Sequence, residues 1–374
     1  MSWPDTGVSA ALRRKLATEL DPEHDTGWAD AFAAVPRHVF VPRYYAQADD
    51  RSWRTVHLGD PGYLETVYSD RALTTQLDEH GIPTSSSSEP ALMLAMLNAL
   101  DSRDGDTVFE LGTGTGYNAA LLSHRLGDDN VTSLEVDPLL VEAAANRLEQ
   151  VGYRPCVITG DGARGWPRRA PYARILATAA LRAVPTAFLN QAAPGAVIVA
   201  PIGFGVMRAT VTAPGHATGR FLPTPAHFMP RRVPTATPAF DAVRSVEPRD
   251  SKVAPADLLD RLRFLLSIAL PGHSSCSWRD DEGGLTAVGL WTEDGSTATA
   301  HVSGAVRQTG PRRLWDVVED LAAIFHGTTH REDFRVTITP GRQTVSYGSP
   351  DGPAWELLAS PAFEERGFGG GAPE

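Results

Sequence analysis

Lysine is almost absent from this chain, since Lys15 and Lys252 are the only two among 34 basic residues. Acidic residues outnumber basic ones by 45 to 34, which gives a formal net charge of −11 at pH 7. General nucleic-acid-binding proteins usually carry a basic surplus, so this balance argues against a nucleic-acid partner. Three arginine pairs could form local basic spots, and we interpret them as surface pairs: Arg168-Arg169, Arg231-Arg232 and Arg312-Arg313.

Cysteine is equally scarce, with Cys156 and Cys276 far apart and no CxxC or paired-histidine motif near them. This pattern favours two free thiols over a zinc or redox site, and we expect no metal site. No basic-then-apolar segment opens the chain, and no apolar run approaches the roughly 18 residues that a membrane span needs. The sequence therefore predicts a cytoplasmic protein without a membrane segment.

The segment 107–117 carries the strongest functional signal. A short apolar run ends in three glycines at alternate positions, Gly112, Gly114 and Gly116, and a helical pattern follows from Tyr117. Strand, glycine turn and helix together make a nucleotide-type cofactor site, because glycines admit close approach and the helix N-terminus offers free N–H groups. An NAD fingerprint would place the third glycine one residue later. An acid before the turn, Glu110, and another at the end of the next predicted strand, Glu135, favour S-adenosylmethionine.

Strands and helices alternate around this turn. The apolar pattern predicts strands over 107–111, 130–135, 154–159, 173–178 and 196–201, and helices over 117–126, 138–151 and 184–191. Such alternation predicts an α/β domain with a mainly parallel sheet and helices on both faces. We assign residues 101–215 to this Rossmann-like cofactor domain.

The flanking blocks differ in texture. Residues 1–100 are expected to form a helical, substrate-side segment, with helices over 8–20, 28–34 and 91–100, extended chain over 35–42 and a serine loop over 83–90. Frequent prolines predict a linker over 216–249. Residues 250–366 are expected to form a separate α+β domain, with helices over 257–270 and 312–325 and strands over 285–291, 297–302, 334–339 and 343–347. The glycine-rich tail 367–374 is expected to be disordered.

With these segments placed, the chain resembles the protein-L-isoaspartate O-methyltransferase family. The matching pieces are Val35-Pro-Arg-His-Val-Phe-Val-Pro42, Tyr68-Ser-Asp-Arg-Ala-Leu73, Glu89-Pro90, Phe109-Glu-Leu-Gly-Thr-Gly-Thr-Gly-Tyr117, Gly160-Asp-Gly162, 170–176 and Pro194-Gly195. They occur in family order over about residues 30–205. The resemblance implies a class I methyltransferase fold, S-adenosylmethionine as methyl donor and a peptide carboxylate as acceptor.

The resemblance also implies roles for single residues. Glu110, Gly112, Gly114 and Gly116 would form the loop around the methionine part of the cofactor, Glu135 would bind the ribose hydroxyls, and Asp161 and Gly162 would flank the adenine. The rest of the expected cofactor set is Thr113, Tyr117 and Val136. Ser88 aligns with the family's serine in Ser-Ala-Pro-His and is the expected catalytic residue. Its hydroxyl, or one from Thr84, Ser85, Ser86 or Ser87, would orient the acceptor carboxylate, which is already ionised and needs no strong base.

Two departures from the family pattern bear on the substrate. Glu89 follows the serine where the family has alanine, and Ala91 replaces the family's histidine. An isoaspartyl residue carries a free α-carboxylate, which an added acid would repel. Residues 216–374 also extend beyond the catalytic block, where a repair enzyme needs no extension.

Both departures favour relatives that modify ribosomally made peptides, such as lanthipeptides or ATP-grasp-linked cyclic peptides. There, methylation of an aspartate lets the next backbone amide attack and expel methanol, leaving a succinimide that can hydrolyse to isoaspartate. The expected partner is therefore a modified ribosomal precursor peptide. Repair of isoaspartyl proteins is the first alternative, and a non-catalytic peptide-binding scaffold is the second. An NAD-linked dehydrogenase fits the glycine spacing less well.

Overall fold

The structure is a computed structural model that describes residues 5–23, 27–48, 52–229 and 237–358. The predicted disordered tail 367–374 lies outside these residues. Among the helices in the described ranges, none is both long and apolar enough to cross a membrane.

A ten-stranded sheet with the order β19-β18-β17-β11-β10-β9-β8-β5-β6-β7 forms the centre of the molecule. Its parallel half contains β5 (Val108–Leu111), β6 (Val131–Glu135), β7 (Cys156–Thr159), β8 (Tyr172–Ala177) and β9 (Ala192–Ile202). The helices of this half are α5 (Pro90–Leu100), α6 (Tyr117–Leu126), α7 (Pro138–Gln150) and α8 (Thr186–Asn190), with short 3-10 turns η1 (Asp128–Asn130), η2 (Gly162–Arg164) and η3 (Pro167–Arg169). The class I methyltransferase fold, with its mixed α/β character, is thus confirmed.

The strand order reverses at β5. β5 pairs with β6 on one side and with β8 on the other, both in parallel, so the carboxyl end of β5 is a topological switch point. All four residues of β5 are buried, as expected for a strand that is covered on both faces. Ligands of open α/β sheets bind at such a point, and the glycine turn follows directly after β5.

The antiparallel half of the sheet differs from the predicted domain boundaries. β10 (Gly205–Ala213), β11 (His216–Pro225), β17 (Phe334–Thr339), β18 (Arg342–Tyr347) and β19 (Ala354–Glu356) continue the sheet beyond β9. The expected linker 216–249 therefore begins with a strand, and its proline spacing misled the prediction. The expected separate domain 250–366 contributes its last strands to the ten-stranded sheet, because β17 pairs with β11.

The N-terminal block is less helical than predicted. It contains α1 (Gly7–Leu20), α2 (Ala29–Ala34), α3 (Arg37–Phe40) and α4 (Tyr63–Val67), together with a sheet of β2 (Trp53–His57), β1 (Arg43–Gln47), β3 (Leu73–Leu77) and β4 (Pro83–Ser87). α1 begins as a capping box, since the side chain of Thr6 accepts a hydrogen bond from Ser9 N at 3.1 Å. The expected extended stretch 35–42 contains the single turn α3. The expected serine loop is strand β4, because pairing with β3 satisfies its backbone.

A C-terminal unit lies between β11 and β17 in the chain. Its sheet has the order β12-β16-β15-β14-β13, from β12 (Arg249–Asp250), β13 (Ser274–Arg279), β14 (Leu285–Trp291), β15 (Thr297–His301) and β16 (Ala305–Thr309). Its helices are α9 (Phe240–Arg244), α10 (Pro255–Leu259), α11 (Arg263–Ala269) and α12 (Leu314–Ile324), and the turn η4 (Arg331–Asp333) leads back to β17. The single helix predicted over 257–270 is two helices, because Asp260 leaves the helical backbone conformation (φ −123°, ψ −102°).

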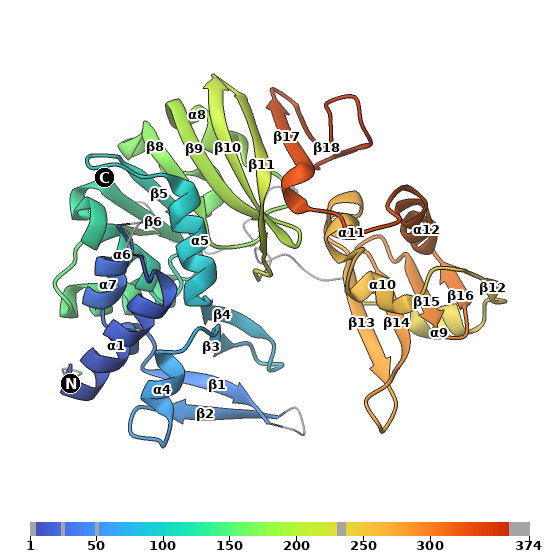
Figure 1. Ribbon diagram of the computed structural model, residues 1–374, viewed down its shortest axis with the longest axis horizontal. Coiled ribbons are helices and arrows are strands. Elements are labelled where there is room, and N and C mark those ends of the chain that lie inside the picture. The colour runs from blue at the N-terminus through green and yellow to red at the C-terminus, as the bar shows by residue number, and fades with distance from the viewer. Residues whose placement is uncertain (1–4, 24–26, 49–51, 230–236, 359–374) are drawn as a thin grey trace, which may run out of the picture.

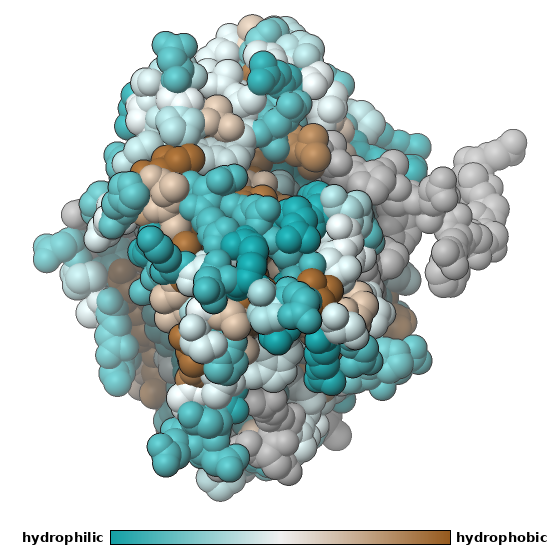
Figure 2. Space-filling view, turned by 90° about the vertical axis from the view of Figure 1, so that its right-hand side faces the viewer, coloured by the Kyte–Doolittle hydropathy of each residue, from teal (hydrophilic) through white to brown (hydrophobic). Residues whose placement is uncertain are grey.

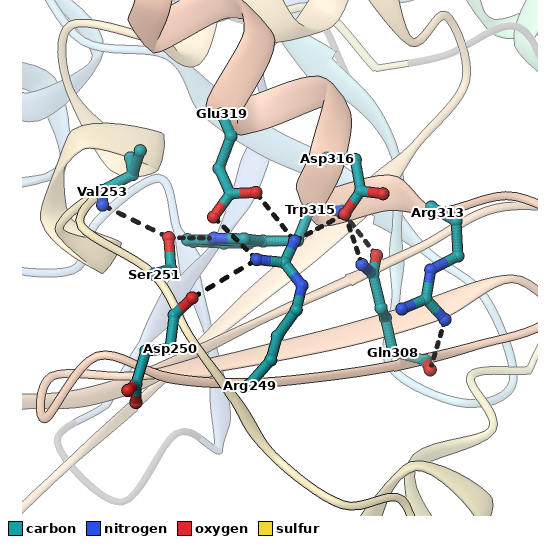
Figure 3. Close-up of polar contacts among 9 residues, drawn as sticks. All are labelled: Arg249, Asp250, Ser251, Val253, Gln308, Arg313, Trp315, Asp316 and Glu319. Carbon is teal, nitrogen blue, oxygen red and sulfur yellow. Dashed lines mark hydrogen bonds and ion pairs between the residues drawn. The ribbon is translucent and has the colours of Figure 1, made fainter.

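An ion-pair network fixes β12 against α12 (Figure 3). Arg249 contacts Asp316 at 2.5 Å and Glu319 at 2.7 Å, and Gln308 Nε2 donates to the same Asp316 carboxylate at 2.6 Å. The indole N–H of Trp315 donates to Ser251 Oγ at 3.0 Å. The hydrogen bonds between Arg249 and Glu319 hold the pKa of Glu319 below its ordinary value. Side-chain contacts therefore stabilise the two-residue strand β12 in addition to its backbone hydrogen bonds.

The C-terminal unit shares a hydrophobic core with the ten-stranded sheet. The ring of Phe264 in α11 lies 5.0 Å from Phe221 in β11 and 5.1 Å from Phe334 in β17, centroid to centroid. Figure 1 shows this junction on the right of the large sheet, with the N-terminal sheet below α5. Hydrophilic side chains cover most of the centre of the unit's outer face (Figure 2). The unit therefore packs the aromatic ring of Phe264 onto β11 and β17.

Candidate active site

The three glycines of the turn have different neighbours. All three have positive φ values, +98° at Gly112, +53° at Gly114 and +89° at Gly116, so other residues would be strained there. A Cβ on Gly112 would lie 2.5 Å from Thr178 Oγ1, and one on Gly116 would lie 3.1 Å from Ala144 Cβ. Gly112 thus lets β5 approach the loop after β8, whereas Gly116 lets α6 approach α7.

Glu135 is held in place at the end of β6. Its Oε2 accepts a hydrogen bond from Gly114 N at 3.0 Å, and its Oε1 accepts from Val136 N at 2.9 Å and Asp137 N at 3.2 Å. These contacts fix the carboxylate beside the glycine turn and leave a lone pair on Oε2 for a ligand. The carboxylate lines the main cavity together with Val136.

Asp161 and Gly162 lie at the end of β7. Asp161 caps η2 by accepting a hydrogen bond from Ala163 N at 3.0 Å. A Cβ on Gly162 would lie 2.6 Å from Leu111 Cγ, so glycine allows η2 to pack against the end of β5. Both residues line the same cavity as Glu135.

Glu110 does not line that cavity, although it was predicted to belong to the loop around the methionine part of the cofactor. Its side chain is fully buried under the turn, where Asn118 Nδ2 donates to it at 2.6 Å and Ser133 Oγ at 2.5 Å. Burial raises the pKa of Glu110 to about 7 against these two hydrogen bonds, and the charge of Glu135 adds to the rise. Glu110 therefore supports the turn from below.

The serine strand β4 forms the opposite wall. A Cβ on Gly114 would lie 3.7 Å from Ser85 Oγ and 3.8 Å from the carbonyl oxygen of Ser86, so β4 and the glycine turn are adjacent. Ser85 and Ser87 are buried, Ser86 and Ser88 are half-buried, and all of them line the cavity. Strand pairing therefore brings the expected catalytic and substrate-side residues to the cofactor turn, although they lie far from it in sequence.

Glu89 is exposed where β4 leads into α5, and it also lines the cavity. The neighbouring amide, Ala91 N, donates to Asp70 Oδ1 at 2.7 Å, so Asp70 caps this end of α5. Burial and the nearby charge of Asp70 raise the pKa of Glu89. Two acids therefore lie close together at the serine end of the cavity.

Arg37 organises this wall, and no role was predicted for it. The side chain is completely buried and donates to the carbonyl oxygens of Val67 at 2.9 Å and Ser88 at 2.9 Å. Further hydrogen bonds from it reach the carbonyl oxygens of Ser69 and Arg71 and the hydroxyl of Ser87. Although Arg37 lies inside a matched sequence piece, only these contacts between distant segments reveal its role.

One cavity of about 650 Å³ unites these groups. Of the predicted cofactor residues, its wall includes Gly112, Thr113, Gly114, Tyr117, Glu135, Val136, Asp161 and Gly162. The predicted catalytic residue Ser88 and the predicted substrate-side residues Ser85, Ser86, Ser87 and Glu89 line it as well. Gly116 and Glu110 lie behind this wall. The remaining wall includes a segment that was predicted to be linker, with Pro225, His227, Phe228 and Met229. Its apolar Phe228-Met229 pair between prolines was the available signal.

Three histidines that are isolated from other polar motifs in the sequence, His80, His273 and His301, lie elsewhere. His80 is exposed beside Glu79, the ring of His273 contacts the carbonyl oxygen of Leu270, and that of His301 contacts Ser303. Contacts of this kind hold side chains in the local structure or at the protein surface. The cavity wall does not include any of the three.

The cavity fits S-adenosylmethionine. Its volume falls within the range of small-molecule sites, and a fixed carboxylate at the end of β6 suits a pair of ribose hydroxyls. The positive-φ glycines at the switch point bring the backbone to the cavity wall without side chains. When bound, this cofactor supplies a methyl group that is already activated for transfer.

Comparison with known proteins agrees with this site. Residues 18–213 match the family described as protein-L-isoaspartate(D-aspartate) O-methyltransferase. A protein-L-isoaspartate O-methyltransferase from Ignicoccus hospitalis is 33% identical over 202 residues, which cover 52% of this chain and 84% of that protein. One from Azorhizobium caulinodans is 39% identical over 174 residues, which cover 46% of this chain and 68% of that protein.

A solved structure described as a protein-L-isoaspartate O-methyltransferase has a similar fold. The match covers 90% of this chain and all of that one, with a TM-score of 0.54 and 19% sequence identity. The likeness in fold thus extends beyond the segment matched by the family. The chain therefore belongs to the protein-L-isoaspartate O-methyltransferase family and is an S-adenosylmethionine-dependent carboxyl O-methyltransferase.

Proposed function

We propose that the acceptor is the free carboxylate of an isoaspartyl residue in a peptide or protein. The observation that carries this proposal is the shared cavity, in which β4 faces the glycine turn across a short gap. The names of the relatives favour an isoaspartyl acceptor over the ribosomal-peptide aspartate that the sequence led us to expect first.

The residues of the site need only bind and align the acceptor. A carboxylate is ionised at neutral pH, so no general base has to remove a proton before transfer. The Ser88 hydroxyl can donate a hydrogen bond to one carboxylate oxygen and so direct the other toward the methyl group. Arg37 fixes Ser88 by binding its carbonyl oxygen, which limits the motion of the hydroxyl.

A second acceptor is supported by Glu89. This residue stands where the family pattern has alanine, and with Asp70 it puts negative charge at the serine end of the cavity, which repels the single reacting carboxylate of either acceptor. The departure from the family pattern therefore supports an altered acceptor such as an aspartate side chain within a ribosomally made, pre-cyclised peptide, whose methyl ester could close to a succinimide with loss of methanol. The C-terminal extension adds less support than expected, because a structure described as an isoaspartate methyltransferase matches 90% of this chain.

Mass spectrometry of two acceptors distinguishes these activities. The full chain is incubated with S-adenosylmethionine and either an isoaspartyl hexapeptide or a pre-cyclised aspartyl peptide encoded beside the gene. Gain of a methyl group by the hexapeptide supports the first proposal. Transient methylation and then net loss of water from the cyclic peptide alone would support the second. Absence of turnover with both, despite cofactor binding, would favour a peptide-binding scaffold.

Two substitutions locate the activity in the proposed site. Ser88→Ala should lower kcat and leave the affinity for S-adenosylhomocysteine unchanged, because the hydroxyl serves the acceptor. Glu135→Ala should weaken that affinity by roughly 1–3 kcal/mol, because the ribose hydroxyls lose their charged partner. Calorimetry measures the affinity and initial rates give kcat. Wild-type turnover in Ser88→Ala would mean that another group aligns the acceptor.

A further inference from the structure

The wall segment 225–229 crosses from β11 to the loop that follows β8. Ala226 N donates to the carbonyl oxygen of Phe204 at 3.4 Å, and Ala180 N donates to that of Met229 at 3.0 Å. Thr178, in the same loop after β8, donates to the carbonyl oxygen of Gly112. The segment is therefore anchored next to the first glycine of the turn.

Strand order shows which end of the cavity this segment covers. The acids at the ends of β6 and β7, Glu135 and Asp161, lie on one side of β5. The loop after β8 and the segment 225–229 lie on the other side. Since the proposed ribose and adenine contacts belong to the first side, the segment covers the opposite end of the cavity. Ala226 and Phe228 of this segment share a buried cluster with Met93 of α5, the helix that follows the serine strand, so we assign this end to the acceptor.

His227 is the polar side chain of this segment that lines the cavity. Its ring stacks on Phe204, with centroids 5.1 Å apart and planes 15° from parallel. The residue is exposed although one face of its ring is covered by Phe204, and within the described residues neither ring nitrogen has a hydrogen-bond partner. Its orientation is thus fixed by stacking while its nitrogens remain available to a ligand.

The C-terminal unit fixes the other partner of this stack. The guanidinium of Arg263, the first residue of α11, lies 4.1 Å from the centroid of the Phe204 ring, a cation–π distance. Phe204 N donates to Ser267 Oγ in the same helix at 2.9 Å. A Cβ on Gly203 would lie 2.1 Å from that oxygen, so glycine is needed for this close approach. α11 therefore holds the ring on which His227 stacks.

Two further observations suit a binding role. Partial burial, followed by the charge of Arg263, lowers the pKa of His227, so the ring is neutral at pH 7 and offers one N–H donor and one acceptor. The segment 225–229 also lies beyond residues 18–213, the part matched by the family. The acceptor end of the cavity is thus built partly by residues outside the segment that the family match covers.

We propose that His227 binds the acceptor peptide, donating its ring N–H to a peptide oxygen beside the reacting carboxylate, and that α11 positions it through Phe204 and Arg263. His227 is then a specificity-determining residue, and Arg263 is a positioning residue that acts through the stack. This inference rests on the proposed peptide methylation, since it names a contact for that acceptor.

Kinetics of three variants test the contact. His227→Ala should raise KM for the better of the two peptides about five- to tenfold, the loss expected for one hydrogen bond, with S-adenosylhomocysteine affinity unchanged. Arg263→Ala should raise KM in the same direction, and the double variant should be no worse than His227→Ala alone, because both act through one contact. His216→Ala, at the start of the preceding strand β11 and with its ring against the Pro214 carbonyl oxygen, is the matched control. An unchanged KM in His227→Ala, or independent effects in the double variant, would overturn the proposal.

A readout without turnover separates this inference from the proposed function. In an NMR titration, the His227 imidazole should respond to addition of peptide and S-adenosylhomocysteine, and Arg263→Ala should raise its pKa because a nearby positive charge is lost. If neither peptide is methylated but the imidazole responds to both changes, the assigned reaction is wrong and the contact stands. Methylation without any response of the imidazole would refute the proposed His227 contact and support the assigned reaction.

Discussion

A buried carboxyl group under the glycine turn makes the stability of the cofactor domain depend on pH. The pKa of Glu110 is about 7 in the folded chain, against an ordinary value of 4.5, chiefly because of burial. The unfolded chain therefore releases this proton at lower pH than the folded chain does. The contribution of Glu110 to the free energy of unfolding is constant below about pH 4.5, falls as the pH rises from there to about 7, and is constant again above pH 7.

Glu110→Gln should remove this dependence. Between about pH 4 and pH 8, the free energy of unfolding of the wild type should fall by about 3 kcal/mol relative to that of the variant. Urea denaturation across that range gives the difference. Glu142→Gln, on the exposed face of α7, controls for the loss of a carboxylate. Parallel curves for wild type and Glu110→Gln would show that Glu110 titrates normally.

Glu89 should slow transfer to a carboxylate acceptor. Glu89→Ala removes negative charge from the serine end of the cavity, so kcat/KM for the isoaspartyl hexapeptide should rise about fivefold at low salt, the effect of one exposed charge at close range. Added salt should shrink the gain. Initial rates at two salt concentrations measure both effects. Glu65→Ala, another exposed glutamate near the N-terminal sheet, should change neither. A lower rate in Glu89→Ala would mean that Glu89 binds the acceptor.

At the scale of elements, α3 and β4 are joined by one side chain. Arg37 leaves the single turn α3 and reaches the carbonyl oxygens of Val67, which ends α4, and of Ser88, which follows β4. Burial lowers the pKa of Arg37 to about 10, so the group stays charged at neutral pH. A charged donor surrounded by carbonyl oxygens ties these short elements together more firmly than their own backbone hydrogen bonds can.

Arg37→Lys should therefore be a disruptive substitution. Lysine keeps the charge but lacks the planar fork that reaches several carbonyl oxygens at once, and the loss should be about 3 kcal/mol of unfolding free energy. Because Ser88 loses its anchor, kcat should fall more than the affinity for S-adenosylhomocysteine. Denaturation, kinetics and calorimetry measure the three quantities. Arg71→Lys, an exposed arginine in the same cluster, is the control, and equal behaviour of the two variants would contradict the assigned role.

The sequence predicts elements well where the pattern is local. Strand β5, its glycine turn and α6 follow from apolar spacing and glycine positions, and so does the expectation of a cofactor site there. β4 and β11 could not be predicted, because serines and prolines carry no strand pattern and become strands only through their partners β3 and β10. Arg37 and His227 were missed for the same reason, since their roles arise from contacts between distant segments.

At the scale of the whole molecule, the catalytic sheet is discontinuous in sequence. β17 pairs with β11 through Thr218–Thr337 and Arg220–Arg335, after the C-terminal unit has been completed. A continuous set of buried side chains runs from Ile198 in β9 to Leu265 in α11 and Trp315 in α12. The C-terminal unit and the cofactor domain therefore stabilise each other and cannot be treated as separate pieces.

A chain that ends at residue 215 should not fold. It would lose β11 and β17 through β19 and expose the edge of β10, whose inner side chains Met207 and Ala209 are fully buried in the intact sheet. We expect aggregation, which size-exclusion chromatography detects, and no cooperative thermal transition by circular dichroism. A chain ending at residue 358 keeps every described strand and is the control. A monodisperse, cooperatively unfolding 1–215 fragment would refute this interdependence.

The pairing of β11 with β17 also means that β11 is synthesised well before its partner strand. Arg220 leaves the ribosome 115 residues before its partner Arg335, which at about 5–20 residues per second is a delay of roughly ten seconds. During that interval the nascent chain presents β11 as an open edge, a template on which another chain could pair. Pro223 and Pro225 near the end of β11 lack the N–H groups that such a wrong pairing would use. The same prolines that hide the strand pattern in the sequence thus reduce incorrect pairing of β11 until its own partner, β17, has been translated.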